Sequence, residues 1–176
     1  MHLPINKTPL IIKDFSGKLN QGNHPGIDII PHDSFYKNNM DKRTKSVQNA
    51  KRMVTKILAV SNGKIVYAGN TNIGGLCVAL DTIINKQRVR FLYCRLGRIY
   101  VKKNQTVEAG QLLARLGDFP DNNLHLHFSV IKNPPNKISQ CFNSNGLLDP
   151  KIFYKNLTQE NGHSILLNKN KGAVNV

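Results

Sequence analysis

The sequence has little of what marks a membrane-spanning or conventionally exported protein. Its 176 residues contain no tryptophan and no apolar run near the roughly 18 to 20 consecutive residues that a membrane helix needs. The first ten residues lack the basic and apolar segments of a signal peptide. We therefore expect no membrane span, and a chain that stays inside the cell, leaves by a route that reads no such signal, or has lost its leader.

Cysteine is scarce as well. Cys77, Cys94 and Cys141 form an odd set without C-x-x-C spacing. This arrangement is typical of neither a disulfide framework nor a cysteine zinc site. We therefore expect the three thiols to be small side chains of the core.

Acidic side chains are few, so the chain is strongly basic. Lys and Arg number 25 against 10 Asp and Glu, which gives a formal net charge of +15. A field of this sign favours anionic partners, such as nucleic acid, acidic lipid or the anionic polymers of a bacterial wall. A Lys- and Asn-rich surface that keeps the protein soluble explains the charge equally well. Aromatic residues do not alternate with the basic ones as a single-strand platform requires, so we expect no specific nucleic acid.

What the sequence does contain is a series of short β patterns. Lys56–Val60 and Lys64–Ala68 flank Asn62-Gly63, a pair typical of a two-residue hairpin turn. Such spacing, with no good helix among the strands, predicts a mainly β fold with a central antiparallel sheet and few short helices. Further apolar runs typical of strands lie at residues 75–80, 88–93, 111–117 and 124–131.

The length predicts a single domain with less regular ends. A basic insertion at 32–56 interrupts this domain, and its second half, at about 42–54, has a short helical pattern. Residues 147–154 are apolar enough to pack back on the sheet. The expected organisation is an irregular N-terminal segment, a β domain and a loosely held polar tail, at residues 1–22, 23–157 and 158–176.

Two histidines stand together in the last strand pattern, as His125-Leu126-His127. Residues two apart in a strand project from the same face, so the two imidazoles share one surface while Leu126 and Phe128 face the other side. An H-x-H pair alone is a weak signal. Two imidazoles displayed together nevertheless favour a site over a core position.

A second candidate lies near the N-terminus, at His24-Pro-Gly-Ile-Asp28. Gly26 allows the backbone to bend sharply, so this short loop brings an imidazole and a carboxylate to one place. Zinc prefers nitrogen, sulfur and carboxylate ligands, and with cysteine unpromising the candidates are His and Asp. Alone, the pentapeptide is more typical of an ordinary turn than of a site.

The order of these pieces resembles the lysostaphin-type zinc endopeptidases, which cut peptide cross-links in bacterial peptidoglycan. The likeness runs from about Asn23 to Tyr154 without the insertion, through the His-x-Gly-x-Asp turn, the Asn-Gly pair, Gly74-Gly75 and the closing His-x-His. It implies one Zn²⁺ held in a groove of the sheet. By resemblance, the ligands are His24, Asp28 and His127, and the catalytic imidazole is His125.

One element departs from the family pattern. These enzymes usually carry a Tyr-x-His-Leu motif whose His is a second catalytic imidazole, and this sequence reads Tyr93-Cys-Arg95-Leu96. Arg95 is therefore expected at the His position. Its guanidinium stays protonated and cannot act as a base, but it can donate hydrogen bonds to an oxyanion or to a substrate carboxylate. His32 or His163 from another loop is an alternative source of the imidazole.

Three functions follow from these observations. The first is a zinc endopeptidase acting on peptidoglycan in the periplasm or cell wall, as a secreted antibacterial effector or lysin, with an immunity or partner protein if it is an effector. The second is a catalytically impaired zinc-site protein that binds cell wall or a protein partner. The third is a basic nucleic-acid-binding module, whose binding would weaken steeply with salt.

Overall fold

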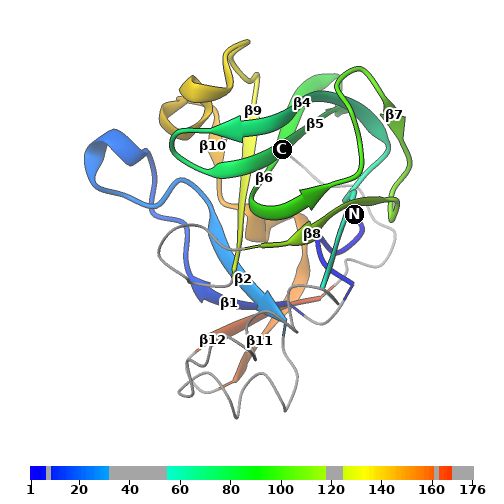
Figure 1. The fold of residues 1–176 in the computed structure, drawn as a ribbon. Helices are drawn as coiled ribbons and strands as arrows, with labels where there is room; N and C mark the ends of the chain where they lie inside the picture. The colour runs from blue at the N-terminus through cyan, green and yellow to red at the C-terminus, as the bar shows by residue number, and fades with distance from the viewer. Residues whose placement is uncertain (7–8, 32–54, 118–124, 161–162, 168–176) are drawn as a thin grey trace.

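The computed structural model describes residues 1–6, 9–31, 55–117, 125–160 and 163–167, and these form mainly β-strands in one sheet (Figure 1). The expected mainly β fold is confirmed. Helical structure in these ranges is limited to short 3-10 turns, η1 (Leu19–Gln21), η2 (Ile138–Asn143) and η3 (Pro150–Phe153). Within them no helix is long and apolar enough to cross a bilayer. The insertion, including the expected helix at 42–54, lies outside the described residues except for its last two positions.

The centre of the sheet is antiparallel throughout. β4 (Gly63–Thr71), β5 (Gly75–Ile84) and β6 (Gln87–Ile99) pair in sequence, and β9 (Leu126–Lys132) pairs with the other side of β6. Short strands complete this part of the sheet: β3 (Lys56–Leu58), β7 (Thr106–Val107), β8 (Leu112–Leu116) and β10 (Leu147–Leu148).

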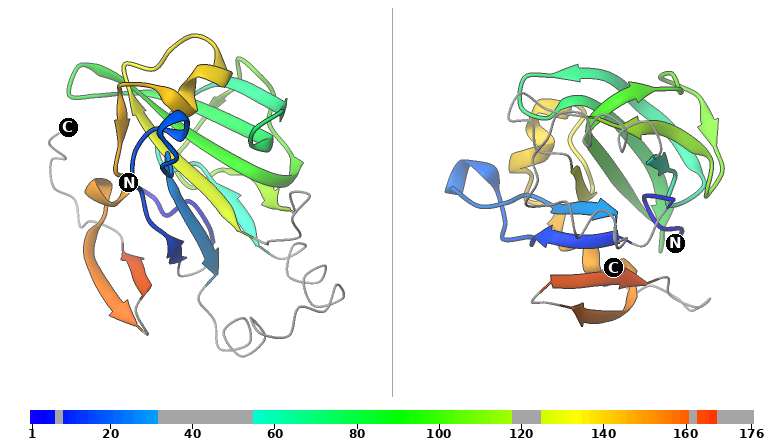
Figure 2. Two further views of the ribbon diagram at one scale, coloured as in Figure 1. Left: turned by 90° about the vertical axis from the view of Figure 1, so that its left-hand side faces the viewer. Right: turned by 60° about the horizontal axis from the view of Figure 1, so that its bottom comes forward.

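Strands from both ends of the chain extend the sheet beyond β9. β2 (Ile27–Pro31) pairs with β9, followed by β1 (Pro9–Lys13), β12 (His163–Leu167) and β11 (Lys155–Glu160), as Figures 1 and 2 show. The sequence predicted an irregular start at 1–22 and a loosely held tail at 158–176, and both segments contain strands within their described residues. In β1 the buried Leu10 and Ile11 lie opposite Ile30 and Ile29 of β2, a pairing that the short pattern did not reveal.

The predicted hairpin at Asn62-Gly63 is wrong. β3 pairs with β8 instead of β4, and the Asn62 carboxamide oxygen accepts a hydrogen bond from the Ala109 N–H at 2.8 Å. A Cβ at Gly63 would lie 2.3 Å from the Asp81 carbonyl oxygen, so this glycine permits close approach of β4 to β5. The two-residue hairpin lies at Asn85 and Lys86, whose φ of 50° and 63° match the left-handed turn that twisted strands require.

Alternate residues of the central strands bury both faces of the sheet. On one face, the Phe91 ring packs against Phe128 and Phe153, with centroids 6.1 Å and 5.7 Å apart. On the other face a smaller cluster of Leu92, Cys94 and neighbours is covered by η2. The burial of Phe153 agrees with the prediction that residues 147–154 pack back on the sheet.

The expectation for the cysteines is wrong in part. Cys77 on β5 and Cys94 on β6 form a disulfide across adjacent strands, with a sequence separation of 17. Spacing along the chain did not reveal this pair, because only the register of the two strands makes them face each other. Cys141 is a free, buried thiol, as predicted.

Candidate metal centre

The pairing of β2 with β9 builds the centre of the site. Asp28 and His127 are register partners, so their side chains lie next to each other on one face of the sheet. The turn that precedes β2 is pressed against β9, since a Cβ at Gly26 would lie 2.5 Å from the Phe128 carbonyl oxygen. This close approach delivers His24 to the same place.

Three side-chain atoms converge there. His24 Nε2 lies 3.1 Å from Asp28 Oδ1 and 3.1 Å from His127 Nδ1, and His127 Nδ1 lies 3.0 Å from Asp28 Oδ1. All three residues are buried, and they form a group able to hold a metal ion. The structure therefore brings together the two halves of the predicted ligand set.

The outer nitrogen of each imidazole is held by a further residue. His24 Nδ1–H donates to the Asp14 carbonyl oxygen at 2.8 Å, which leaves the lone pair on Nε2 directed at the centre. His127 Nε2 lies 3.0 Å from Ser129 Oγ, which leaves Nδ1 directed inward. Such outer partners fix the tautomer and orientation of metal-binding histidines. The sequence analysis missed both, although Ser129 continues the same-face alternation of His125 and His127.

The electrostatics of the site favour unprotonated donors. Burial raises the pKa of the Asp28 carboxyl, but contacts with His127 and His24 and the charges of His127 and His125 outweigh it, so the pKa lies well below its usual range. Burial lowers the pKa of His127. The Asp28 carboxylate opposes this shift, whereas His24 and Arg95 add to it.

The chemistry of this donor set fits zinc. With His24 Nδ1–H donating to the Asp14 carbonyl oxygen, Nε2 faces Asp28 Oδ1 at 3.1 Å, an arrangement in which a cation would bind both atoms. Tetrahedral ligands held at about 2.0–2.1 Å from zinc lie about 3.3 Å from one another. The separations of 3.0–3.1 Å in the structure are close to that value. Two imidazoles and one carboxylate are also a ligand set of catalytic zinc sites, which keep a fourth position open for water.

His125 lies beside this centre. It is buried, and its Nε2 is 3.6 Å from Asp28 Oδ2. Leu126 and Phe128 pack into the core on the other side of β9, as the alternation predicted.

Arg95 reaches the site from β6. It follows Cys94, which is the register partner of His127, and its positive charge contributes to the lowered pKa of His127. Its backbone has a φ of 65°, with the N–H donating to the Gly74 carbonyl oxygen and the carbonyl accepting from Gly117 N–H. Of the alternative imidazoles, His32 lies outside the described residues and His163 begins β12, which β1 separates from β2.

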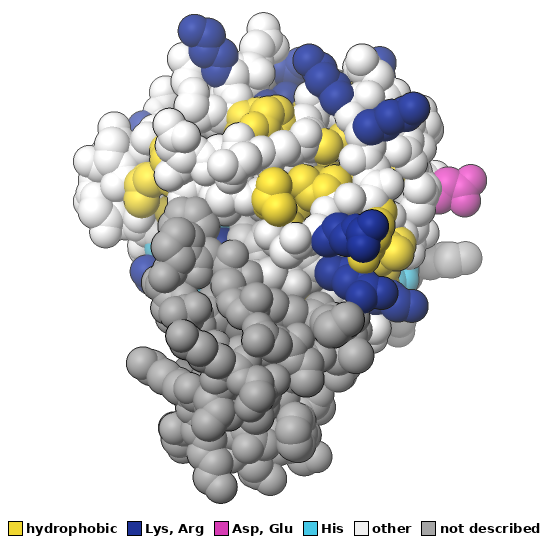
Figure 3. Space-filling view, in the orientation of Figure 1, with side chains coloured by type: hydrophobic (Ala, Val, Ile, Leu, Met, Phe, Trp, Pro, Cys, Tyr) yellow, Lys and Arg dark blue, Asp and Glu magenta, His cyan; other side chains and the backbone are white. Residues whose placement is uncertain are grey.

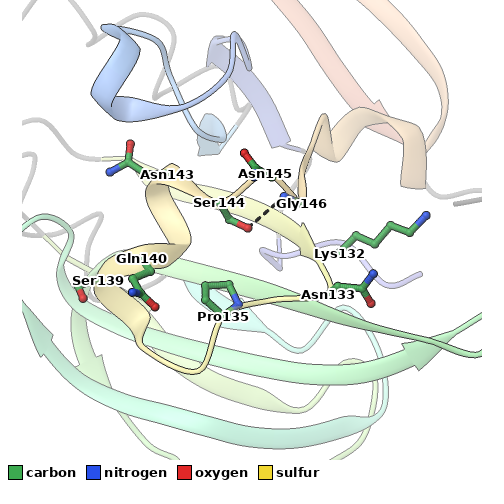
Figure 4. A pocket seen from close by; sticks show the side chains of 9 residues that line it. All are labelled: Lys132, Asn133, Pro135, Ser139, Gln140, Asn143, Ser144, Asn145 and Gly146. Carbon is green, nitrogen blue, oxygen red and sulfur yellow. Dashed lines mark hydrogen bonds between the residues drawn. The ribbon is translucent and has the colours of Figure 1, made fainter.

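Two pockets flank this part of the molecule. One, of about 560 Å³, is lined by the β4–β5 connection and η2 and includes Phe142, whose ring centroid is 6.0 Å from that of His127. The other, of about 790 Å³, is polar and lies between the end of β9 and η2, where Lys132, Gln140 and Asn143 surround it (Figure 4). None of the three converging donors lines either pocket, and the first pocket is linked to the candidate centre through the contact between the Phe142 and His127 rings.

Fold and site together define an antiparallel β domain with a buried His–Asp–His centre of the kind that metallopeptidases use. The chain belongs to peptidase family M23, whose sequence model matches residues 42–139. That match includes Arg95, His125 and His127. It does not include His24 and Asp28. The pairing of β2 with β9 places these two residues beside His127, which the match does include.

Individual relatives agree with this family. The chain is 31% identical to the glycyl-glycine endopeptidase ALE-1 of Staphylococcus capitis over 138 residues, which cover 78% of this chain but only 30% of that protein. It is 34% identical over 76 residues to the lipoprotein NlpD of Yersinia enterocolitica, covering 42% of this chain and 74% of that one. Among solved structures, the catalytic domain of the antimicrobial peptidase lysostaphin from Staphylococcus simulans superposes with a TM-score of 0.53 at 25% identity, covering 82% and 88% of the two chains.

Proposed function

We propose that this chain is a zinc-dependent endopeptidase that hydrolyses peptide cross-links of bacterial peptidoglycan, in the periplasm or the cell wall. The observation that carries the proposal is the convergence of His24, Asp28 and His127 within 3.1 Å of one another, with both imidazoles held from behind. The likeness to a glycyl-glycine endopeptidase and to lysostaphin supports the choice of substrate.

The residues around the donors have distinct roles in this proposal. When bound, one zinc ion lowers the pKa of its water to about 7 and polarises the scissile carbonyl. His125 takes the proton of the attacking water, since its Nε2 lies on the Asp28 side of the centre at 3.6 Å from Oδ2. Arg95 donates hydrogen bonds to the developing oxyanion or to a substrate carboxylate, because its guanidinium is always protonated.

The pocket beside Phe142 is the proposed place for the peptide. Its lining combines the Tyr67 and Phe142 side chains with several asparagines, and it contains Lys103 and Lys137 but no acidic residue among those the structure describes. Aromatic and amide groups of this kind hold an extended peptide, while the two ammonium groups suit a carboxylate-bearing stem.

A second candidate function is a catalytically impaired member that keeps zinc and binds cell wall or a partner protein. Arg95 favours this alternative, because the family resemblance predicts a second imidazole at its position in the sequence. Loss of one general acid–base group typically costs about 10² to 10⁴ in rate. The two candidates therefore differ in whether cleavage is measurable.

The decisive experiment joins metal analysis to a peptidoglycan digest. Wild type and His127→Ala are compared, with His2→Ala as the matched control because His2 is exposed and away from the centre. We expect about one zinc per chain and release of peptide fragments from wild type and the control, and neither from His127→Ala. If the wild type holds zinc but releases no fragments, and the Arg95→His variant does release them, the impaired candidate is established. Wild type without zinc would overturn both.

An antibacterial role is a further part of this proposal. Expression of the chain directed to the periplasm of a susceptible bacterium should cause lysis, and the His127→Ala variant should not. Protection by a protein encoded beside the gene would identify an immunity partner. Growth without lysis would contradict the effector role. The enzymatic proposal would still be decided by the peptidoglycan digest.

A further inference from the structure

A row of three cations crosses the outer surface of the sheet. Arg115 on β8 is the register partner of Lys56 on β3 and of Arg98 on β6. The next register positions, Ile57, Ala114 and Ile99, face the core, so the three cations face outward. We call Lys56, Arg115 and Arg98 the cation row.

The cation row has no counterion among the described residues. The described aspartates other than Asp28 pair elsewhere, Asp14 and Asp149 with Lys151 and Asp81 with Arg90. Like charges directly opposite each other on neighbouring strands destabilise a sheet. Lys and Arg side chains dominate the charged groups on this side of the molecule (Figure 3). A row that forms no ion pair with the described part of the chain is expected where an anionic partner binds.

An aromatic ring organises the two arginines. The guanidinium carbons of Arg98 and Arg115 lie 5.4 Å and 6.0 Å from the centroid of Tyr100, which is 39% exposed. Contact with the ring limits the freedom of both side chains, and planar guanidinium forks bind carboxylates through two hydrogen bonds. The ring already carries these cations, so it is a poor platform for stacking a nucleic-acid base.

The row shares a strand with a residue that acts on the candidate centre. Arg98 follows Arg95 by three positions on β6, and the positive charge of Arg95 contributes to the lowered pKa of His127. A repetitive polymer that places one peptide at the centre therefore brings neighbouring groups near the row.

We propose that the cation row, with Tyr100, is a docking surface for carboxylates of peptidoglycan stem peptides that are not being cleaved. This inference rests on the proposed function, because it takes its polymer from there. The row holds the wall while the centre acts on an adjacent cross-link. Binding at the row requires neither metal nor cleavage.

The test is binding to purified peptidoglycan sacculi, measured by co-sedimentation at low salt with a chelator and in a His127→Ala background. The variant is Arg98→Gln/Arg115→Gln. The matched control is Lys64→Gln/Lys86→Gln, which removes the same charge from exposed positions on β4 and the β5–β6 turn. We expect Kd to rise about fivefold in the variant, since two exposed ion-pair contacts of roughly two- to threefold each multiply to that value. The control should stay within about twofold.

Three further measurements make the result decisive. The variant should unfold at the same temperature as its parent or higher, because the like-charge repulsion is relieved. Amidated sacculi have lost the carboxylates that the row is proposed to bind, so the parent and the variant should bind to them equally. If the glutamine variant fails to fold, Arg98→Lys/Arg115→Lys keeps the charge without the fork and should bind about twofold more weakly.

Two outcomes would overturn the inference. One is an equal loss of binding in the variant and the control, which would reduce the effect to net charge. The other is competition by a short DNA duplex that the variant abolishes while binding to sacculi is unchanged, which would make nucleic acid the partner. Row-dependent binding without any cleavage by the wild type would overturn only the endopeptidase proposal.

Discussion

Replacing Ser129 by alanine tests whether residues behind the donors tune the metal site. Ser129 Oγ lies 3.0 Å from His127 Nε2, and both residues are buried, so no water is expected to take over this contact freely. With a metal bound by Nδ1, Nε2 would carry the proton and donate it to the hydroxyl. Ser129→Ala removes the acceptor and releases the ring to rotate or change tautomer.

The expected loss is large enough to measure. Removing an outer partner of a metal-binding histidine typically weakens metal affinity about 10- to 100-fold, which is about 1.4 to 2.7 kcal/mol at 1.36 kcal/mol per tenfold change. The buried Nε2–H left without an acceptor also lowers the free energy of unfolding by about 1 to 3 kcal/mol.

The assay is zinc competition against a chromophoric chelator, with denaturant unfolding of the metal-free protein run in parallel. Ser139→Ala is the matched control, because Ser139 is exposed on η2 and is neither one of the three donors nor a residue that contacts their outer nitrogens. We expect zinc affinity to fall in Ser129→Ala and to stay unchanged in Ser139→Ala. A folded Ser129→Ala chain that binds zinc within twofold of wild type would refute the reasoning about His127.

Four other perturbations have defined outcomes. Gly26→Ala forces a Cβ to within 2.5 Å of a β9 carbonyl oxygen, so urea unfolding should show a loss of about 1 to 3 kcal/mol and zinc affinity should fall. Tyr93→Phe leaves a buried backbone N–H without its 3.0 Å acceptor, and unfolding should show a loss of about 1 to 3 kcal/mol; an unchanged midpoint would contradict this. Reducing Cys77–Cys94, or replacing both residues by Ser, should lower stability by about 3 kcal/mol for a separation of 17, seen as a lower melting temperature with a non-chelating reductant. Burial lowers the pKa of His127 in the folded protein, so as pH falls His127 is protonated in the unfolded chain before it is protonated in the folded one. The metal-free protein should lose stability as pH falls below about 6.5, and His127→Gln should flatten that dependence.

The parts of the molecule that the sequence predicted well are those with local signals. The alternation around His125-Leu126-His127 predicted which side chains face the core, because the strand period alone decides it. The mainly β class followed from the spacing of apolar runs for the same reason. The burial of Phe153 was likewise visible as an apolar segment after a Pro-rich loop.

What the sequence could not supply is non-local pairing. Asn62-Gly63 has the residues of a hairpin turn, yet β3 pairs with β8, and Gly63 instead permits β4 to approach β5 closely. Cys77 and Cys94 meet only through the register of two strands.

At the site, the converging residues were named from a family resemblance, and turn and strand patterns alone left each half ambiguous. The two outer partners differ in how far sequence could have found them. The Asp14 contribution is a backbone carbonyl, so its side chain carries no signal for it. Ser129 was visible in the alternation and was overlooked.

The register pair of Asp28 with His127 also constrains when the site can exist during folding. These two side chains are separated by 99 residues, and nothing holds them together until β2 has docked on β9. Closing a loop of that length has an entropic cost that grows with the logarithm of its length, so this contact is expected late in folding. A metal that binds His24, Asp28 and His127 together binds only states in which β2 is paired with β9, and therefore stabilises them over every state that lacks this pairing. In such a chain, metal occupancy reports that β2, from the N-terminal part of the sequence, has joined the strands of the central sheet.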